Sequence, residues 1–193
     1  MEAEITQKKL TVEDVLRLNT EHHWVEIVDG EIIKMSPVGF RHSYISNNGY
    51  DVLNPFVKTH KLGYVANDGL IYVLHVDPET GVRHTRVPDL SFFRKGKFPD
   101  FDFTKPVPGA PDLAIEIVSP SESDETTINK LRSYFAYGTE QVWVLFPESK
   151  FVYQYFDVDD VKIHTEDKTF TAETLFPGLE IKVADFFIEP DIK

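Results

Sequence analysis

The sequence predicts one domain of the α/β or α+β class, in which helices pack against a mixed β-sheet. Segments of helical periodicity alternate with segments of strand character, in the order helix, hairpin, helix, several strands, helix, strands. The chain has 193 residues, the length of a single domain, and 41% of them are hydrophobic, which is enough for a core. We therefore expect one domain over residues 1–193, with its core between about residue 10 and residue 187.

The first elements carry local signals. Thr11 is a predicted helix N-cap, with Asp14 three residues later and an apolar stripe formed by Val12, Val15, Leu16 and Leu18. Two strand-like segments, 24–28 and 31–35, then flank Asp29-Gly30, a dipeptide that readily adopts positive φ in a tight turn. This pattern predicts a hairpin, and the spacing of apolar residues over 42–58 predicts a second helix.

The rest of the chain predicts most of the sheet. Strands are expected over 64–74, 86–93 and 112–118, and the segment 97–111 carries four prolines, typical of a surface loop. A helix over 126–137 should end at Gly138, because glycine suits the left-handed residue that follows a helix. Two strands over 141–146 and 151–156 and several short strands over 161–187 complete the prediction.

Composition excludes several classes of protein. The chain has no cysteine, which excludes disulfides, thiolate zinc sites and cysteine nucleophiles and fits a reducing compartment. Residues 1–9 contain no apolar signal core, and eighteen apolar residues never run together. These features predict a cytoplasmic protein without a membrane span. The net charge of −12 argues against a broad basic surface for nucleic acid.

Common catalytic motifs are also missing from the sequence. The seven histidines show no spacing typical of zinc hydrolases, and neither a glycine-rich phosphate loop nor a Gly-x-Ser-x-Gly motif occurs. The sequence therefore disfavours kinase, P-loop, Rossmann and serine-hydrolase functions.

Two acidic residues lie in apolar strand-like segments. Glu116 is in the middle of segment 112–118, which is apolar on both faces and so predicts a buried central strand. A carboxylate there needs a metal, hydrogen-bond donors or the cation of a structural salt bridge. Asp89 follows Pro88 at another apolar strand, although Pro-Asp also commonly begins a turn. Together the two acids predict a site for a hard cation such as Mg²⁺.

Two further charged residues have alternative interpretations. Glu26 shares a strand face with Trp24 and Val28, so it is either a third acid at the metal or an edge-strand charge. Lys130 lies on the helix after Glu116, beside a predicted core stripe of Ile128, Leu131 and Phe135 and on one face with Tyr134 and Tyr137. Its alternative interpretation is a solvated helix lysine.

The order of these motifs resembles the Uma2 family of restriction-endonuclease-like proteins, in the PD-(D/E)xK superfamily. The likeness rests on Trp-Val-Glu-Ile-Val-Asp-Gly-Glu-Ile, a helix opened by His42, Arg-Val-Pro-Asp-Leu and Pro-Asp-Leu-Ala-Ile-Glu-Ile-Val-Ser-Pro-Ser, followed by Lys130, Tyr134, Gly138 and Val142-Trp143-Val144. It covers about residues 10–187. It implies a restriction-endonuclease-like fold, with a mixed central sheet flanked by helices.

The resemblance also implies a site. Asp89 matches the aspartate of the PD element and Glu116 the acidic residue of (D/E)xK, whereas Val118 stands where the lysine is normally found. The lysine then comes from the next helix as Lys130, and Glu26 matches an early glutamate that completes the acidic cluster. The implied catalytic residues are Asp89, Glu116 and Lys130, and the implied metal ligands are Asp89, Glu116 and Glu26.

The function implied is a Mg²⁺-dependent endonuclease, with Mn²⁺ as a substitute ion and DNA as substrate. Two alternatives stay open: a catalytically silent binding or scaffold domain on the same fold, and a metal-dependent hydrolase of small phosphate esters. Dimerisation is common on this fold, so a homodimer is compatible with the resemblance. A nuclease should also gather basic residues around the acidic cleft, drawn from Arg41, Lys58, Lys61, Arg83, Arg86, Arg94 and Lys95.

Overall fold

The computed structural model describes residues 9–192 except residues 23, 68 and 120–122. Most of the polar N-terminal segment, residues 1–8, lies outside the described residues, as do Pro120 and Ser121 of the family motif. The helices are α1 (Val12–His22), α2 (Phe40–His60), α3 (Asp124–Ala136) and α4 (Val183–Phe186). The strands are β1 (Val25–Val28), β2 (Glu31–Lys34), β3 (Gly63–Asn67), β4 (Tyr72–Asp77), β5 (Gly81–Arg86), β6 (Leu90–Arg94), β7 (Val107–Pro108), β8 (Leu113–Ile117), β9 (Gln141–Phe146), β10 (Phe151–Asp157), β11 (Asp160–His164), β12 (Thr169–Thr171) and β13 (Glu180–Lys182).

A six-stranded mixed sheet forms the centre of the fold, in the order β11-β10-β9-β8-β6-β3. β8 and β9 are parallel, and α3 supplies the crossover that parallel neighbours require. The other neighbouring pairs are antiparallel. The predicted fold class, a mixed central sheet flanked by helices, is therefore confirmed.

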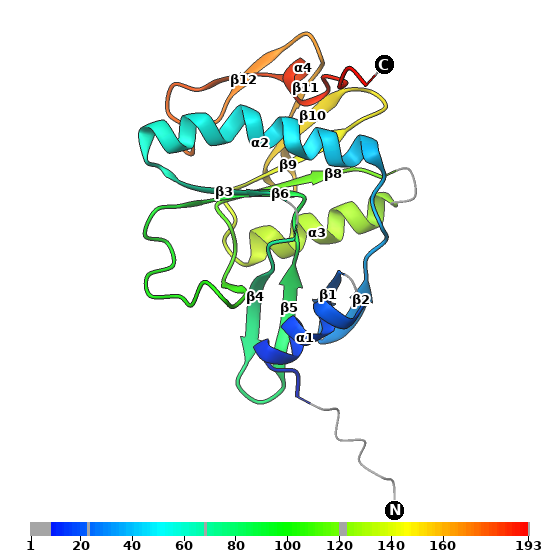
Figure 1. Cartoon of the computed structure of the whole chain (residues 1–193), viewed down its shortest axis with the longest axis vertical. Coiled ribbons are helices and arrows are strands. Elements are labelled where there is room, and N and C mark those ends of the chain that lie inside the picture. Colours follow the sequence, from blue (N-terminus) through cyan, green and yellow to red (C-terminus); the bar gives the residue numbers. More distant parts are fainter. Residues whose placement is uncertain (1–8, 23, 68, 120–122, 193) are drawn as a thin grey trace, which may run out of the picture.

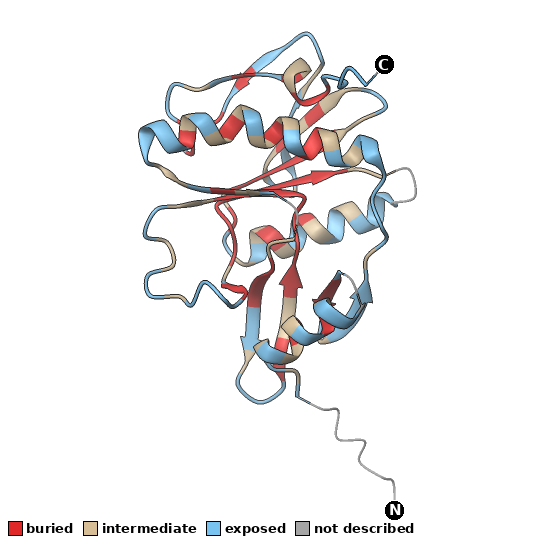
Figure 2. Ribbon diagram, in the orientation of Figure 1, coloured by how far each residue is buried: buried red, intermediate tan, exposed pale blue. Residues whose placement is uncertain are grey.

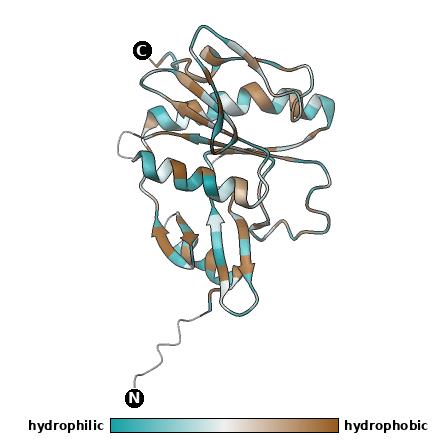
Figure 3. Cartoon of the chain, turned by 180° about the vertical axis from the view of Figure 1, so that it is seen from behind, coloured by the Kyte–Doolittle hydropathy of each residue, from teal (hydrophilic) through white to brown (hydrophobic). Residues whose placement is uncertain are grey.

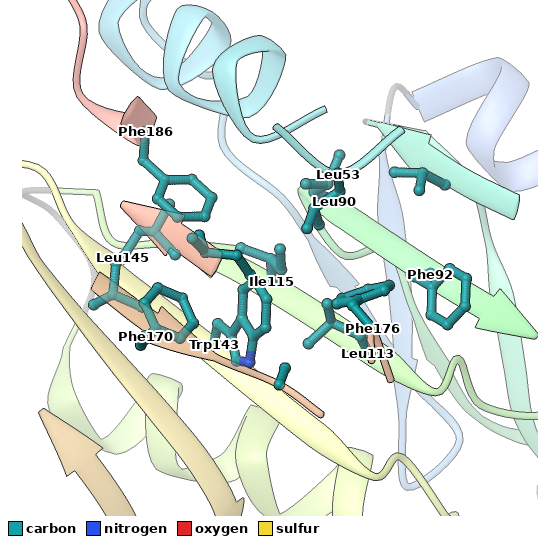
Figure 4. Packing of buried hydrophobic residues seen from close by; sticks show 14 of the residues in the cluster. Leu53, Leu90, Phe92, Leu113, Ile115, Trp143, Leu145, Phe170, Phe176 and Phe186 are labelled. Atoms are coloured by element: carbon teal, nitrogen blue, oxygen red, sulfur yellow. The ribbon is translucent and has the colours of Figure 1, made fainter. Parts of the chain in front are cut away.

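The two faces of this sheet are covered by different elements. α2, α4 and the β12–β13 hairpin lie on one face, and α3 lies on the other (Figure 1). Leu113, Ile115 and Ile117 of β8 point into the first core, where Trp143 packs edge-to-face against Phe170 with ring centroids 5.1 Å apart (Figure 4). Ala114 joins the second core, against α3. Burial is concentrated along the central strands (Figure 2), and β8 is buried throughout.

A smaller β layer lies beyond α3 (Figure 1). It contains the β4–β5 hairpin with β7, the β1–β2 hairpin and α1. The backbone N–H of Ile27 in β1 donates to Thr85 Oγ1 in β5 at 2.8 Å, which ties the two hairpins together. The β1–β2 hairpin is largely hydrophobic (Figure 3), and Ile32 and Ile33 are exposed.

The local signals near the N-terminus are confirmed. Thr11 caps α1, because Asp14 N–H donates to Thr11 Oγ1 and Thr11 N–H donates to Asp14 Oδ2, both at 3.1 Å. Asp29 and Gly30 have φ angles of 53° and 83°, as the predicted tight turn requires. Among the described helices, none combines the length and the apolar character needed to cross a bilayer.

Two predicted strands are wrong in extent. Segment 64–74 divides into β3 and β4, which belong to different sheets, and Gly69 between them has a φ of +96°. A β-carbon on Gly69 would lie 2.5 Å from the Trp24 ring, so a larger residue does not fit. Segment 86–93 divides into β5 and β6 around Pro88, which cannot donate a ladder hydrogen bond.

Candidate active site

The two acidic residues predicted to form the site lie on β8 and directly before its neighbouring strand β6. Asp89 immediately precedes β6, and β6 pairs with β8 so that Leu90 lies opposite Ile115. Extending this register by one residue places Asp89 opposite Glu116, and opposite residues of an antiparallel pair share a face. Both side chains are buried. Asp89 therefore lies at the start of β6, beside the strand that carries Glu116.

Asp89 is held by contacts from β8 and α2. The backbone N–H of Ile117 donates to Asp89 Oδ2 at 2.7 Å, and His42 Nε2 lies 3.1 Å from the same oxygen. Ser46 Oγ donates to the Asp89 backbone oxygen at 2.8 Å. Burial raises the pKa of Asp89, and nearby Glu116 adds to this, whereas His42 and the Ile117 N–H act in the opposite direction.

Glu116 receives a hydrogen bond on each carboxylate oxygen. Lys130 Nζ donates to Oε2 at 2.7 Å, and the Tyr134 hydroxyl donates to Oε1 at 2.6 Å. The Lys130 side chain is 15% exposed, so the interpretation of Lys130 as a solvated helix lysine is wrong. Lys130 and Glu116 form a buried salt bridge, which was one of the partners that the sequence allowed for a buried Glu116. The family resemblance also implied that Lys130 belongs to the site.

The buried face of α3 differs from the predicted one. Tyr134 is fully buried together with Leu131, whereas Ile128 is exposed. The helix is rotated relative to the expected apolar stripe, because Tyr134 packs into the core beneath β8 and β9 and places its hydroxyl on Glu116. Burial, together with Glu116 and Glu26, raises the pKa of Tyr134 far above its usual range, so the phenol remains a hydrogen-bond donor.

Glu26 lies in the same cluster but has different partners. Arg86 Nη1 donates to Oε2 at 2.6 Å, and the backbone N–H of Val87 donates to Oε1 at 2.9 Å. Arg86 also donates to Ser133 Oγ on α3 at 2.8 Å. Glu26 lies on β1, in a two-stranded sheet, and is 4% exposed; burial raises its pKa despite the neighbouring Arg86.

A cleft of about 780 Å³ opens beside this cluster. Its walls come from the β1–β2 hairpin and the segment after it, the start of α2, the end of β8, α3 and the β9–β10 turn. Its charged lining residues are three acids and three bases: Glu26, Asp89, Glu148, Lys34, Arg41 and Lys130. Arg41 Nη1 donates to Glu148 at 2.6 Å.

The basic residues expected around the cleft are only partly gathered there. Arg41 lines the cleft, and Arg86 lies against Glu26, which also lines it. Arg94 instead forms ion pairs with Asp112 and Glu140. Lys34 lines the cleft and was not among the predicted residues. The charge of the cleft is therefore balanced and not strongly basic.

The carboxylates beside the cleft differ in how many of their oxygens already have partners. Within the described ranges, no three His, Asp or Glu side chains are grouped so that they could hold a metal ion together. Mg²⁺ often binds only one or two carboxylates and takes its other ligands from water and phosphate. The contacts that His42 and the Ile117 N–H make with Asp89 both fall on Oδ2, and each Glu116 oxygen keeps a second lone pair. Asp89 therefore has the oxygen most open to such an ion, whereas Glu116 and Glu26 each accept one donor on both oxygens.

Comparison with known proteins supports these observations. A family model described as "Putative restriction endonuclease", Uma2, matches residues 12–184. The chain belongs to the Uma2 family. The crystal structure of a putative nuclease belonging to DUF820 from Anabaena variabilis is similar in fold, with a TM-score of 0.75 and 23% sequence identity, over 92% of this chain and 97% of that chain. None of the curated proteins matches the chain.

In this Uma2 protein, the four residues selected from the sequence lie in one cluster, and sequence reasoning missed three partners. Those partners are His42, Arg86 as the partner of Glu26, and Tyr134 as a ligand of Glu116. A signal for His42 was present, because it precedes the buried residues Ile45 and Ser46 by three and four positions and so continues their helix face.

Proposed function

We propose that the protein is a Mg²⁺-dependent endonuclease that hydrolyses phosphodiester bonds in DNA. The observation that carries the proposal is the arrangement of Asp89, directly before β6, and Glu116, on the paired strand β8, beside a cleft, with the Lys130 ammonium bound to Glu116. Membership of the Uma2 family and the nuclease-like fold support it. A cytoplasmic location and the use of Mn²⁺ in place of Mg²⁺ belong to the same proposal.

Each residue has a role that its contacts support. Asp89 and Glu116 would hold the cation, which when bound supplies a Lewis acid for a phosphate oxygen and lowers the pKa of a coordinated water. Lys130, from its position at Glu116, orients the attacking water and stabilises the negative charge that develops on the phosphate in the transition state. Tyr134 and the Ile117 N–H fix the two carboxylates.

A catalytically silent binding domain is the second candidate, favoured by the internal pairing of the charges. Glu26 and Glu116 have partners on both oxygens, and Arg41 at the cleft is paired with Glu148. A balanced cleft also suits a small phosphate ester better than a long polyanion.

Purified protein incubated with plasmid and with single-stranded DNA, in Mg²⁺, in Mn²⁺ and in chelator, tests the proposal. Asp89→Asn should abolish cleavage, and the matched control Asp51→Asn, which changes an exposed acid of α2 outside the cleft, should retain it. DNA binding without cleavage by the parent would favour the silent domain. Hydrolysis of p-nitrophenyl phosphate without DNA cleavage would favour a small phosphoesterase.

A further inference from the structure

α2 contacts Asp89 at both its side chain and its backbone. His42 Nε2 lies 3.1 Å from Oδ2, and Ser46 Oγ donates to the Asp89 backbone oxygen at 2.8 Å. These residues are four positions apart on the helix, so they lie on one face, one turn from each other. Gly49 follows Ser46 by three residues on that face, and a β-carbon there would lie 3.0 Å from Leu90 Cδ2. A glycine here lets α2 approach the start of β6 closely.

The contacts on Asp89 are unevenly divided between its two oxygens. His42 and the Ile117 N–H both meet Oδ2, from α2 and β8 respectively. Two donors from different elements that meet the same oxygen restrict the rotation of the carboxylate group. Within the described part of the chain, the contacts found for this side chain leave Oδ1 as the oxygen available to an incoming ligand, and Asp89 lines the cleft.

We infer that His42 is a positioning residue, which holds Asp89 so that Oδ1 faces the cleft as a ligand for a divalent cation. The inference rests on the proposed function for the identity of that ligand. His42 acts by donating a hydrogen bond from Nε2 to Oδ2. The role needs a donor at that point and does not need proton transfer. Groups that orient a ligating carboxylate or histidine typically change metal affinity by about 10- to 100-fold when removed.

Two substitutions separate positioning from other roles of His42. Glutamine places an amide N–H donor near the position of imidazole Nε2, whereas alanine removes the donor, so His42→Gln should behave like the parent and His42→Ala should not. His60 lies on the same helix and is exposed, which makes His60→Ala a control for loss of a histidine from α2. Near-ultraviolet circular dichroism, in which the buried Trp143 reports on the core, checks the fold of each variant.

The first measurement uses the protein without metal. The Ile117 amide resonance reports on Asp89, because its N–H donates to Oδ2. It should shift in His42→Ala and stay near the parental position in His42→Gln and His60→Ala. The His42 imidazole should carry its proton on Nε2 in the parent. An Ile117 amide unmoved in His42→Ala would overturn the inference, because Asp89 would then be held without His42.

The second measurement is Mn²⁺ affinity by calorimetry. His42→Ala should bind Mn²⁺ about tenfold or more weakly, and His42→Gln within about threefold of the parent. Equal affinity in all three proteins, or no Mn²⁺ binding by the parent, would overturn the inference. DNA cleavage by the parent is scored separately. If cleavage is absent while the Mn²⁺ and amide results hold, the proposed function fails and the role of His42 stands.

Discussion

The ion pair between Lys130 and Glu116 can be tested by its contribution to stability. Lys130→Met removes the ammonium and keeps an apolar stem, and Glu116→Gln keeps the shape and hydrogen-bonding capacity of the side chain. The side chains are 15% and 6% exposed, so this is a buried pair. Removing one partner of such a pair typically costs about 3–5 kcal/mol, because the other charge remains buried.

The expected loss for Lys130→Met lies at the lower end of that range. Tyr134 still donates to Glu116 at 2.6 Å, and water reaches part of the Lys130 site. We expect the free energy of unfolding to fall by about 3 kcal/mol, which for a chain of this length lowers the melting temperature by about 6–12 °C. Adding Glu116→Gln removes the uncompensated charge, so the double variant should be more stable than Lys130→Met alone.

Urea unfolding followed by tryptophan fluorescence measures all four proteins of this double-mutant cycle, since Trp143 is fully buried. Arg132→Met is the matched control, because Arg132 lies on the same helix and is exposed, and its free energy of unfolding should change by no more than about 0.5 kcal/mol. A coupling energy below about 0.5 kcal/mol would refute the reasoning, since that is typical of an exposed pair.

Three further predictions concern the cation and the chemistry. Lys130→Met should eliminate plasmid cleavage, and adding Val118→Lys should recover part of it, because Val118 lines the cleft and follows Glu116 on the same strand face. Cleavage by Lys130→Met at the parental rate would contradict this prediction. Millimolar Mn²⁺ should raise the melting temperature of the parent but not of Asp89→Asn, by about 1.4 kcal/mol in stability when the free ion is tenfold above its Kd. Burial raises the pKa of Asp89, so the contribution of this carboxyl to the free energy of unfolding is full below about pH 4 and is lost as the pH rises through the folded-state pKa. Without metal, the melting temperature of the parent should therefore fall relative to that of Asp89→Asn over that pH interval. Parallel curves of melting temperature against pH would contradict the assignment.

The parts of the fold that follow from local chemistry were predictable. The Thr11 and Asp14 cap and the Asp29-Gly30 turn involve residues close in sequence, so the pattern determines them. The failed strand predictions depend on contacts that are distant in sequence. The Trp24 ring packs against Gly69 between β3 and β4, and Glu26 takes the Val87 N–H between β5 and β6. Neither contact is visible in the strand periodicity of its own segment.

The site was predictable to the extent that it interrupts an apolar pattern. Glu116 is an acid in an otherwise apolar strand, and this alone indicated a buried carboxylate with partners. Tyr134 was grouped with Lys130, and both donate to Glu116, but it was left out of the core stripe because apolar periodicity does not weigh the hydrogen bond that a buried tyrosine makes through its hydroxyl. His42 lies in the polar first turn of α2. The sequence of that turn does not distinguish a histidine that contacts a carboxylate from one that is solvated, because the contact with Asp89 depends on how the helix packs.

The acidic composition of the chain and the proposed phosphodiester chemistry can be reconciled by where the charges lie. Each buried acid of the cluster has its own partner inside the protein: Arg86 for Glu26, Lys130 for Glu116 and His42 for Asp89. The net charge of −12 is therefore not concentrated at the site, because the acids of the cluster are accompanied by cations or donors. Such a site does not attract a long polyanion by its own field, so DNA affinity would depend mainly on contacts within the cleft and on the bound cation. Under the proposed function, Asp89, whose contacts with His42 and the Ile117 N–H both fall on Oδ2, is consequently the residue at which a divalent ion would enter without first displacing an arginine or a lysine.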